Sequence, residues 1–180
     1  FKTKNKEVSM GVNKPMKIGI LSAGGDCPGI NAAIRGVGKS AILHYGMKVI
    51  GISSGFTGLI DKEYIELDAN QLSGILTLGG TILGTSREKP FKANENYKSS
   101  ISKPEIIKKN YHELELDCLV CIGGNGTQTT ASLLAKEGLN VVGIPKTIDN
   151  DVWGTDFTFG FDSAVKRATE AIDRLHTTAN

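Results

Sequence analysis

Two loops of this sequence combine residue types that suit phosphate chemistry. The first reads Gly-Gly-Asn-Gly-Thr at residues 123–127 and follows the apolar run Cys118–Ile122. Glycines between a buried strand and a helix let backbone N–H groups approach a phosphate, and the helix dipole favours its negative charge. Thr127 stands at the expected helix start, where its hydroxyl suits either an N-cap or a contact with phosphate or metal. The loop therefore predicts a polyphosphate site.

The second loop reads Pro-Lys-Thr-Ile-Asp-Asn-Asp at residues 145–151. In an extended chain Thr147, Asp149 and Asp151 project to one side, which aligns a hydroxyl with two carboxylates. One carboxylate could accept a proton from an attacking alcohol while the other attracts Mg²⁺, and phosphoryl transfer depends mainly on such positioning and charge neutralisation. Taken alone, the same residues also fit an Asp/Asn-rich turn held by its own hydrogen bonds. The preceding Lys146 and the glycine loops upstream favour phosphate chemistry.

Two more glycine-rich segments have the same character. Residues 22–26 read Ser-Ala-Gly-Gly-Asp and follow the apolar strand expected over Met16–Leu21, while residues 79–87 end in Arg87. Hydroxyls, N–H groups and a bidentate guanidinium suit phosphate oxygens. A plain surface loop with a solvated Arg87 explains the second segment equally well.

Short apolar strands alternate with helical segments along the chain. The strands are expected over 16–21, 48–52, 118–122 and 141–144, with an edge strand over 64–67, and the helices over 28–45, 102–113, 127–137 and 161–178. This alternation predicts an α/β fold, a Rossmann-like parallel sheet with helices on both faces. In such sheets the ligand loops gather at the carboxyl ends of the strands, where three of the polar loops are expected.

Composition excludes several classes of protein. The chain has 180 residues, 39% of them hydrophobic, and a net charge of +2, so no strong electrostatic footprint for nucleic acid is expected. We expect no membrane span, no secretory signal and a cytoplasmic location. Three cysteines give no disulfide framework, and Cys118 and Cys121 would point to opposite faces of a strand, so buried reduced thiols are expected instead of a metal or redox pair. Residues 1–15 are polar and lysine-rich, which predicts a flexible tail before a single lobe over 16–180.

Five motifs in order resemble the 6-phosphofructokinase family. They are the segments 24–35, 79–87, 123–127, 145–151 and 171–175. The resemblance covers about Met16 to Asn180 and implies the N-terminal lobe of a two-lobed fold, with the second lobe and much of the sugar-phosphate pocket absent. It implies transfer of phosphate from ATP or pyrophosphate to the 1-hydroxyl of fructose 6-phosphate in glycolysis, with Mg²⁺, by a homodimer or homotetramer. The isolated 180-residue chain would bind the donor weakly and not turn over.

The resemblance also assigns roles residue by residue. Asp149 looks like the general base, Thr147 a sugar or phosphoryl contact, and Lys146 a neighbour of the transferring phosphoryl group. Asp151 resembles the second carboxylate near Mg²⁺. The donor site would comprise Gly25, Arg87, Gly124, Asn125, Gly126 and Thr127.

The glycine turn departs from the family pattern at Asn125, where the family has a Mg²⁺-binding aspartate. An amide oxygen can ligate Mg²⁺ without adding charge, or the metal is held by Asp151 and the donor phosphates. Donor choice stays open as well: Gly126 leaves room for ATP, whereas Lys146 is typical of pyrophosphate enzymes. We favour ATP because some ATP-dependent members combine these two residues.

Other functions fit less well. A regulatory subunit that kept the fold without turnover is supported mainly by Asn125. NAD kinases and diacylglycerol kinases share the glycine turn but lack the 145–151 loop. A dinucleotide-binding dehydrogenase would need a G-x-G-x-x-G motif, which this sequence does not contain.

Overall fold

Six strands form one sheet in the computed structural model, which describes residues 14–92 and 100–179. The strand order is β3-β2-β1-β4-β5-β6. The strands are β1 (Lys17–Ala23), β2 (Lys48–Ile52), β3 (Tyr64–Leu67), β4 (Cys118–Gly123), β5 (Val141–Thr147) and β6 (Phe159–Gly160). All neighbouring pairs are parallel except β2 and β3, which are antiparallel. The α/β Rossmann-like fold expected from the alternation is confirmed, with β3 as its edge strand.

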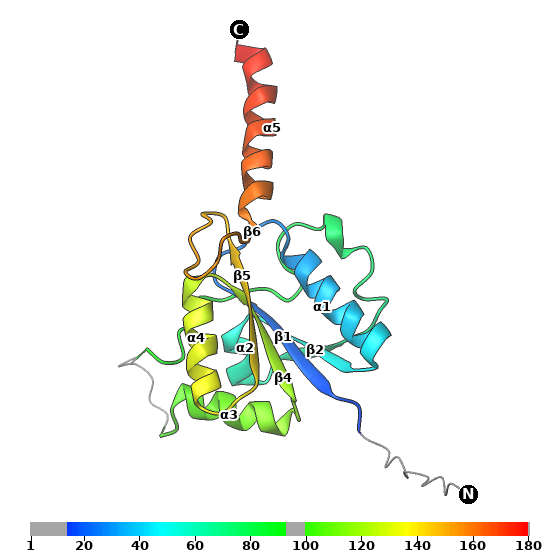
Figure 1. The fold of residues 1–180 in the computed structure, drawn as a ribbon, viewed down its shortest axis with the longest axis vertical. Helices are drawn as coiled ribbons and strands as arrows, with labels where there is room; N and C mark the ends of the chain where they lie inside the picture. Colours follow the sequence, from blue (N-terminus) through cyan, green and yellow to red (C-terminus); the bar gives the residue numbers. More distant parts are fainter. Residues whose placement is uncertain (1–13, 93–99, 180) are drawn as a thin grey trace, which may run out of the picture.

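Helices cover both faces of this sheet (Figure 1). They are α1 (Ile30–Tyr45), α2 (Phe56–Asp61), α3 (Lys103–Glu113), α4 (Asn125–Lys136) and α5 (Phe161–Ala179), with a 3-10 turn, η1 (Ile75–Thr77). One core cluster joins α1 and η1 to one face of β1, β2 and β4, and the other joins α2, α3 and α4 to the opposite face. Alternation along β1 explains the division, because Ile18 and Ile20 enter the first cluster while Leu21 and Ala23 enter the second.

The chain reverses its direction of travel across the sheet between β1 and β4. It runs outward from β1 to β2 and β3, and then returns to place β4 on the other side of β1. A crevice forms at the carboxyl ends of the strands where the order reverses in this way, and ligands of open α/β sheets bind there. The topology therefore puts the loops after β1 and β4 at the ligand-binding edge.

Local signals account for several helix ends. Ser102 forms the expected capping box with Glu105, and Gly46 ends α1 in a left-handed conformation with φ 61°. By contrast, α2 and β6 were not expected from the sequence, since each is too short to show a hydrophobic period. Helix α4 begins two residues before the expected Thr127. Residues 1–13 of the expected tail lie outside the described part of the chain.

Helix α5 extends away from the sheet (Figure 1). Its apolar residues recur at helical spacing, yet Val165, Ile172 and Leu175 are 49%, 64% and 69% exposed. The period that predicted the helix therefore does not mark a buried stripe within the described chain. Among residues 14–92 and 100–179, no helix is both long enough and apolar enough to cross a membrane.

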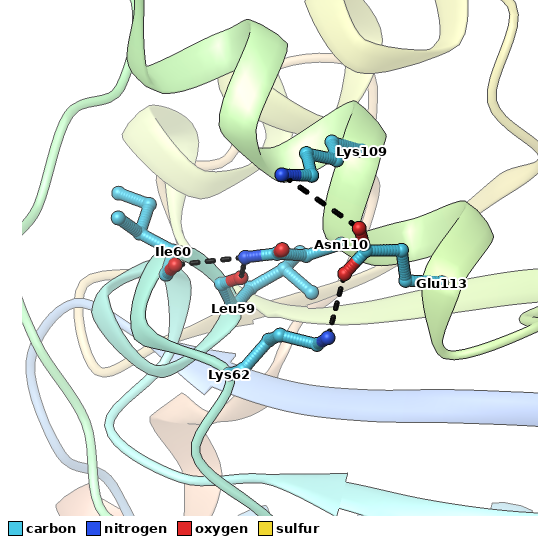
Figure 2. Close-up of polar contacts among 6 residues, drawn as sticks. All are labelled: Leu59, Ile60, Lys62, Lys109, Asn110 and Glu113. Atoms are coloured by element: carbon cyan, nitrogen blue, oxygen red, sulfur yellow. Dashed lines mark hydrogen bonds and ion pairs between the residues drawn. The ribbon is translucent and has the colours of Figure 1, made fainter. Parts of the chain in front are cut away.

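A buried amide connects α3 to the end of α2. Asn110 is 5% exposed, and its Nδ2 donates to the carbonyl oxygens of Leu59 at 2.9 Å and Ile60 at 2.8 Å (Figure 2). These carbonyls belong to the last turn of α2, where helical carbonyls lack partners within the helix. Nearby, Lys62 Nζ and Glu113 Oε2 form an exposed ion pair at 2.6 Å. The buried amide, more than the ion pair, fixes α2 on α3.

We expect Asn110→Ala to lower the free energy of unfolding by about 2–3 kcal/mol, because two carbonyls lose their donor and a small cavity remains. Urea unfolding of the 180-residue chain measures this change. The control Glu113→Gln weakens only two exposed ion pairs, with Lys62 and Lys109, so its unfolding midpoint should stay close to that of the wild type. Equal midpoints for Asn110→Ala and the wild type would contradict the assigned role of the amide.

Candidate active site

A pocket of about 430 Å³ lies at the carboxyl ends of β1, β4 and β5. Its volume is within the usual range for small-molecule sites. All the site residues predicted from the sequence line it, namely Gly25, Arg87, Gly124, Asn125, Gly126, Thr127, Lys146, Thr147, Asp149 and Asp151. The structure thus brings the four polar loops together, while the role of each residue stays a prediction.

The glycine turn after β4 is packed too closely for a side chain at its first position. A Cβ added to Gly123 would lie 2.2 Å from Thr127 Oγ1 and 2.6 Å from the carbonyl oxygen of Ala23. Thr127 is buried and its hydroxyl donates to the same carbonyl at 3.2 Å. The N-cap of α4 is Gly124, so the N-cap interpretation of Thr127 is wrong and its hydroxyl instead joins α4 to β1.

The loop that ends in Arg87 is attached to the loop after β1. The N–H of Gly24 donates to Ser86 O at 2.8 Å, and Thr85 Oγ1 donates to Gly24 O at 2.6 Å. Gly24 has φ 90°, a conformation that favours glycine. These contacts place the exposed Arg87 at the mouth of the pocket, and so favour a ligand loop over an unrelated surface loop.

Lys146 forms part of the pocket wall. Its side chain is 5% exposed, and Nζ donates to the carbonyl oxygen of Gly25. The buried thiol of Cys27 lies nearby: burial raises the pKa of Cys27, although the Lys146 charge acts in the opposite direction. Burial also raises the pKa of Cys121 well above its usual range. Both thiols are therefore less acidic than a solvated cysteine. Of the Cys118 and Cys121 pair that was expected to be buried, Cys121 is buried and Cys118 is half-buried.

The loop after β5 bends instead of staying extended. Asn150 has φ 51°, and its Oδ1 accepts hydrogen bonds from the N–H of Thr158 at 3.1 Å and from its hydroxyl at 3.2 Å. Thr147 Oγ1 accepts from the N–H of Asp149 at 3.0 Å and donates to Asp151 Oδ1 at 3.0 Å. The expectation of an extended segment was therefore wrong, since side-chain hydrogen bonds fold the loop into a turn. The turn nevertheless directs both carboxylate residues to the pocket.

Asn125 connects the two halves of the site. Its Nδ2 donates to the carbonyl oxygen of Asp151 at 3.0 Å, and its Oδ1 accepts from the N–H of Trp153 at 3.1 Å. Both ends of the carboxamide are therefore engaged by the loop that carries Asp149 and Asp151.

The lining residues that were not predicted as site residues include Asp26, Phe56, Glu88 and Lys89. Asp26 had a visible signal, because it directly follows the two glycines of the first loop. Phe56 had none, since it reaches the pocket from the unexpected helix α2. Glu88 and Lys89 simply extend the Arg87 loop. The pocket consequently contains carboxylates and cations from separate elements.

Comparisons with known proteins agree with this arrangement. The family model described as Phosphofructokinase matches residues 17–180. A curated relative from Bacteroides thetaiotaomicron, named ATP-dependent 6-phosphofructokinase 3, is 63% identical over 165 residues, or 92% of this chain. One from Spirochaeta thermophila, named ATP-dependent 6-phosphofructokinase, is 64% identical over 165 residues, or 90% of this chain.

Solved structures show the same fold. The crystal structure of Pichia pastoris phosphofructokinase in the T-state is similar, with a TM-score of 0.80 and 33% identity over 97% of this chain and 20% of its own. The chain spans about half the length of the curated relatives it matches, 49% of the Bacteroides protein and 45% of the Spirochaeta protein.

The glycine turn offers a matched pair of substitutions. Gly123→Ala should destabilise the chain by about 1–3 kcal/mol, because the new methyl group meets backbone and side-chain atoms at the junction of β1 and α4. Gly126→Ala meets nothing within 4 Å, so it should unfold at or slightly above the wild-type urea concentration. Urea unfolding of both variants checks this prediction, and equal losses of stability would contradict the packing described for Gly123.

Proposed function

Because the chain belongs to the phosphofructokinase family, we propose that it forms the phosphate-donor half of an ATP-dependent 6-phosphofructokinase. The proposed reaction moves the terminal phosphoryl group of ATP to the 1-hydroxyl of fructose 6-phosphate and gives fructose 1,6-bisphosphate. One observation carries the proposal: the N-terminus of α4 and two glycine loops line the same pocket as the carboxylate residues of the 145–151 loop. A phosphotransferase needs this pairing of a donor cradle with a proton acceptor.

The donor cradle is built from backbone groups. The first turn of α4 presents free N–H groups, and its dipole adds partial positive charge at Asn125 and Gly126. Gly25 lies opposite, on the loop after β1, and an added Cβ at Gly25 or Gly126 meets no atom within 4 Å. We propose that the donor phosphates lie between these loops, with Arg87 pairing to their oxygens at the pocket mouth.

Asp149 is the proposed general base. Its side chain is exposed at the pocket, on the turn held by Thr147, so a sugar hydroxyl could approach it from solvent. Removal of the hydroxyl proton by Asp149 would make the sugar oxygen a better nucleophile toward the phosphoryl group. In the proposed enzyme the lobe beyond this chain supplies the remaining contacts to the sugar phosphate.

The carboxylates suit Mg²⁺. Proteins usually bind this ion through one or two carboxylates together with substrate phosphates and water. Asp151 fits that description, because Thr147 donates to its Oδ1, while its Oδ2 has no hydrogen bond or ion pair with residues 14–92 and 100–179. In the described residues no cluster of three or more His, Cys, Asp or Glu could hold a metal, which favours an ion shared with the donor. Asn125 fits less well, since its oxygen already accepts from Trp153.

When bound, Mg²⁺ would neutralise charge on the transferring phosphoryl oxygens. Lys146 would add a positive charge at the pocket wall, where its ammonium already contacts Gly25. Pyrophosphate is the second candidate donor, and this buried lysine is the feature that favours it. We also propose that the full-length enzyme is cytoplasmic, forms a homo-oligomer and acts in glycolysis.

A coupled assay with ATP and fructose 6-phosphate tests the function in the full-length protein that contains these residues. Asp149→Asn should lower kcat by about 10²–10⁴-fold, because the proton acceptor is lost, and leave the KM for ATP nearly unchanged. The matched control Asp156→Asn alters an exposed aspartate outside the pocket and should keep wild-type kcat. If the full-length protein shows no turnover with ATP and none with pyrophosphate, the proposed function is refuted in favour of a regulatory subunit.

Gly126→Asp tests donor choice in the same assay. The site tolerates a Cβ, so the variant should fold normally, whereas the added carboxylate would crowd and repel the nucleotide phosphates. We expect kcat/KM for ATP to fall at least about tenfold relative to that for pyrophosphate. If the ratio of the two kcat/KM values stays constant, the nucleotide does not lie against Gly126.

A further inference from the structure

The Asn125 side chain binds the backbone on both sides of Val152. Its Nδ2 donates to the carbonyl oxygen of Asp151 at 3.0 Å, and its Oδ1 accepts from the N–H of Trp153 at 3.1 Å. A backbone carbonyl can only accept and a backbone N–H can only donate, so these partners determine which end of the amide is oxygen and which is nitrogen. The carboxamide therefore bonds the main chain around residue 152 as the backbone of a neighbouring strand would in a β ladder.

This pattern requires a carboxamide. An aspartate at position 125 could accept from Trp153, but it would place a second acceptor, and a negative charge, against the Asp151 carbonyl. The departure from aspartate therefore has a positive structural reason, independent of metal binding.

The two hydrogen bonds join elements that serve different halves of the site. Asn125 is the first residue of α4, whose N-terminus faces the pocket. The bonded loop carries Asp149 and Asp151, and it is held from its other side by the contact between Thr147 and Asp151. Val152, between the two bonded groups, is 5% exposed and anchors this part of the loop. Asn125 thus ties the carboxylate loop to the phosphate-binding helix.

We propose that Asn125 is a positioning residue that fixes the Asp149–Trp153 loop on the N-terminus of α4. Its catalytic consequence rests on the proposed function: the base and the metal-binding carboxylate are held at a constant distance from the donor phosphates. Chemical positioning of this kind affects kcat more than donor affinity, because the phosphates are bound by backbone groups that the side chain does not supply.

Three variants separate this role from direct metal binding. Asn125→Ala removes both hydrogen bonds, and Asn125→Asp keeps the acceptor but removes the donor. The matched control is Asn140→Asp, which makes the same chemical change in an exposed asparagine whose Nδ2 donates to the carbonyl oxygen of Asp117 at 3.0 Å. Asn140 precedes β5, at the opposite end of that strand from the pocket.

The first measurement is hydrogen exchange of the Trp153 backbone amide in the 180-residue chain, by NMR. The amide should exchange about fivefold faster in Asn125→Ala than in the wild type, since its acceptor is lost, and at the wild-type rate in Asn140→Asp. Addition of Mg²⁺ with ADP to the wild type should not accelerate it. Unchanged exchange in Asn125→Ala, or acceleration by Mg²⁺ with ADP, would overturn the proposal, the latter because the oxygen would have left Trp153 for the metal.

The second measurement is steady-state kinetics of the same variants in the full-length protein. Asn125→Asp and Asn125→Ala should both lower kcat about tenfold while the KM for ATP changes by less than about threefold. A metal-ligand role predicts instead that Asn125→Asp is as active as the wild type or more active, which would overturn the proposal. If the wild type itself shows no turnover, the proposed function fails, and the exchange measurement still decides the contact.

Discussion

The contact of β1, β4 and α4 around Gly123 determines the geometry of the pocket. Only a residue without a side chain fits there, because Thr127 passes over Gly123 to donate its hydroxyl to the Ala23 carbonyl. This contact brings the first turn of α4 against the end of β1. The loops after both strands then face each other across the crevice where the strand order reverses. A larger residue at 123 would separate the loops that form the proposed donor cradle.

Much of this arrangement could be predicted from local sequence patterns. An apolar run that stops at two glycines identifies both a strand and its carboxyl end, and parallel strands bring their carboxyl ends to one edge. The loops after Ala23, Gly123 and Thr147 were therefore expected together, and the structure places them in one pocket. The roles of individual residues came from the resemblance to a family, because the pattern of apolar runs and glycines does not distinguish those roles. The family itself is shown by the match over residues 17–180.

The remaining features depend on contacts between distant residues. Helix α2 is fixed by Asn110, which lies about fifty positions further along the chain. No hydrophobic period in the local sequence predicts this helix. The bend after β5 arises from hydrogen bonds of Thr147 and Asn150, whereas alternation suggested an extended segment. The partners of Asn125 could not be read from composition either, since the side chain bonds backbone atoms 26 and 28 residues away. The sequence predicted Asn125 in the glycine turn that lines the pocket, but it did not predict the hydrogen-bond partners of this side chain.

In the proposed enzyme, the loops after β1 and β4 bind the phosphates of the donor. The most direct test is an NMR titration of the 180-residue chain with inorganic tripolyphosphate, which follows every backbone amide. We expect saturable shifts at Gly24, Gly25 and the amides of residues 124–127, with little change at the opposite end of the sheet near Asp117. Shifts confined to other surfaces, or none at saturating tripolyphosphate, would contradict it.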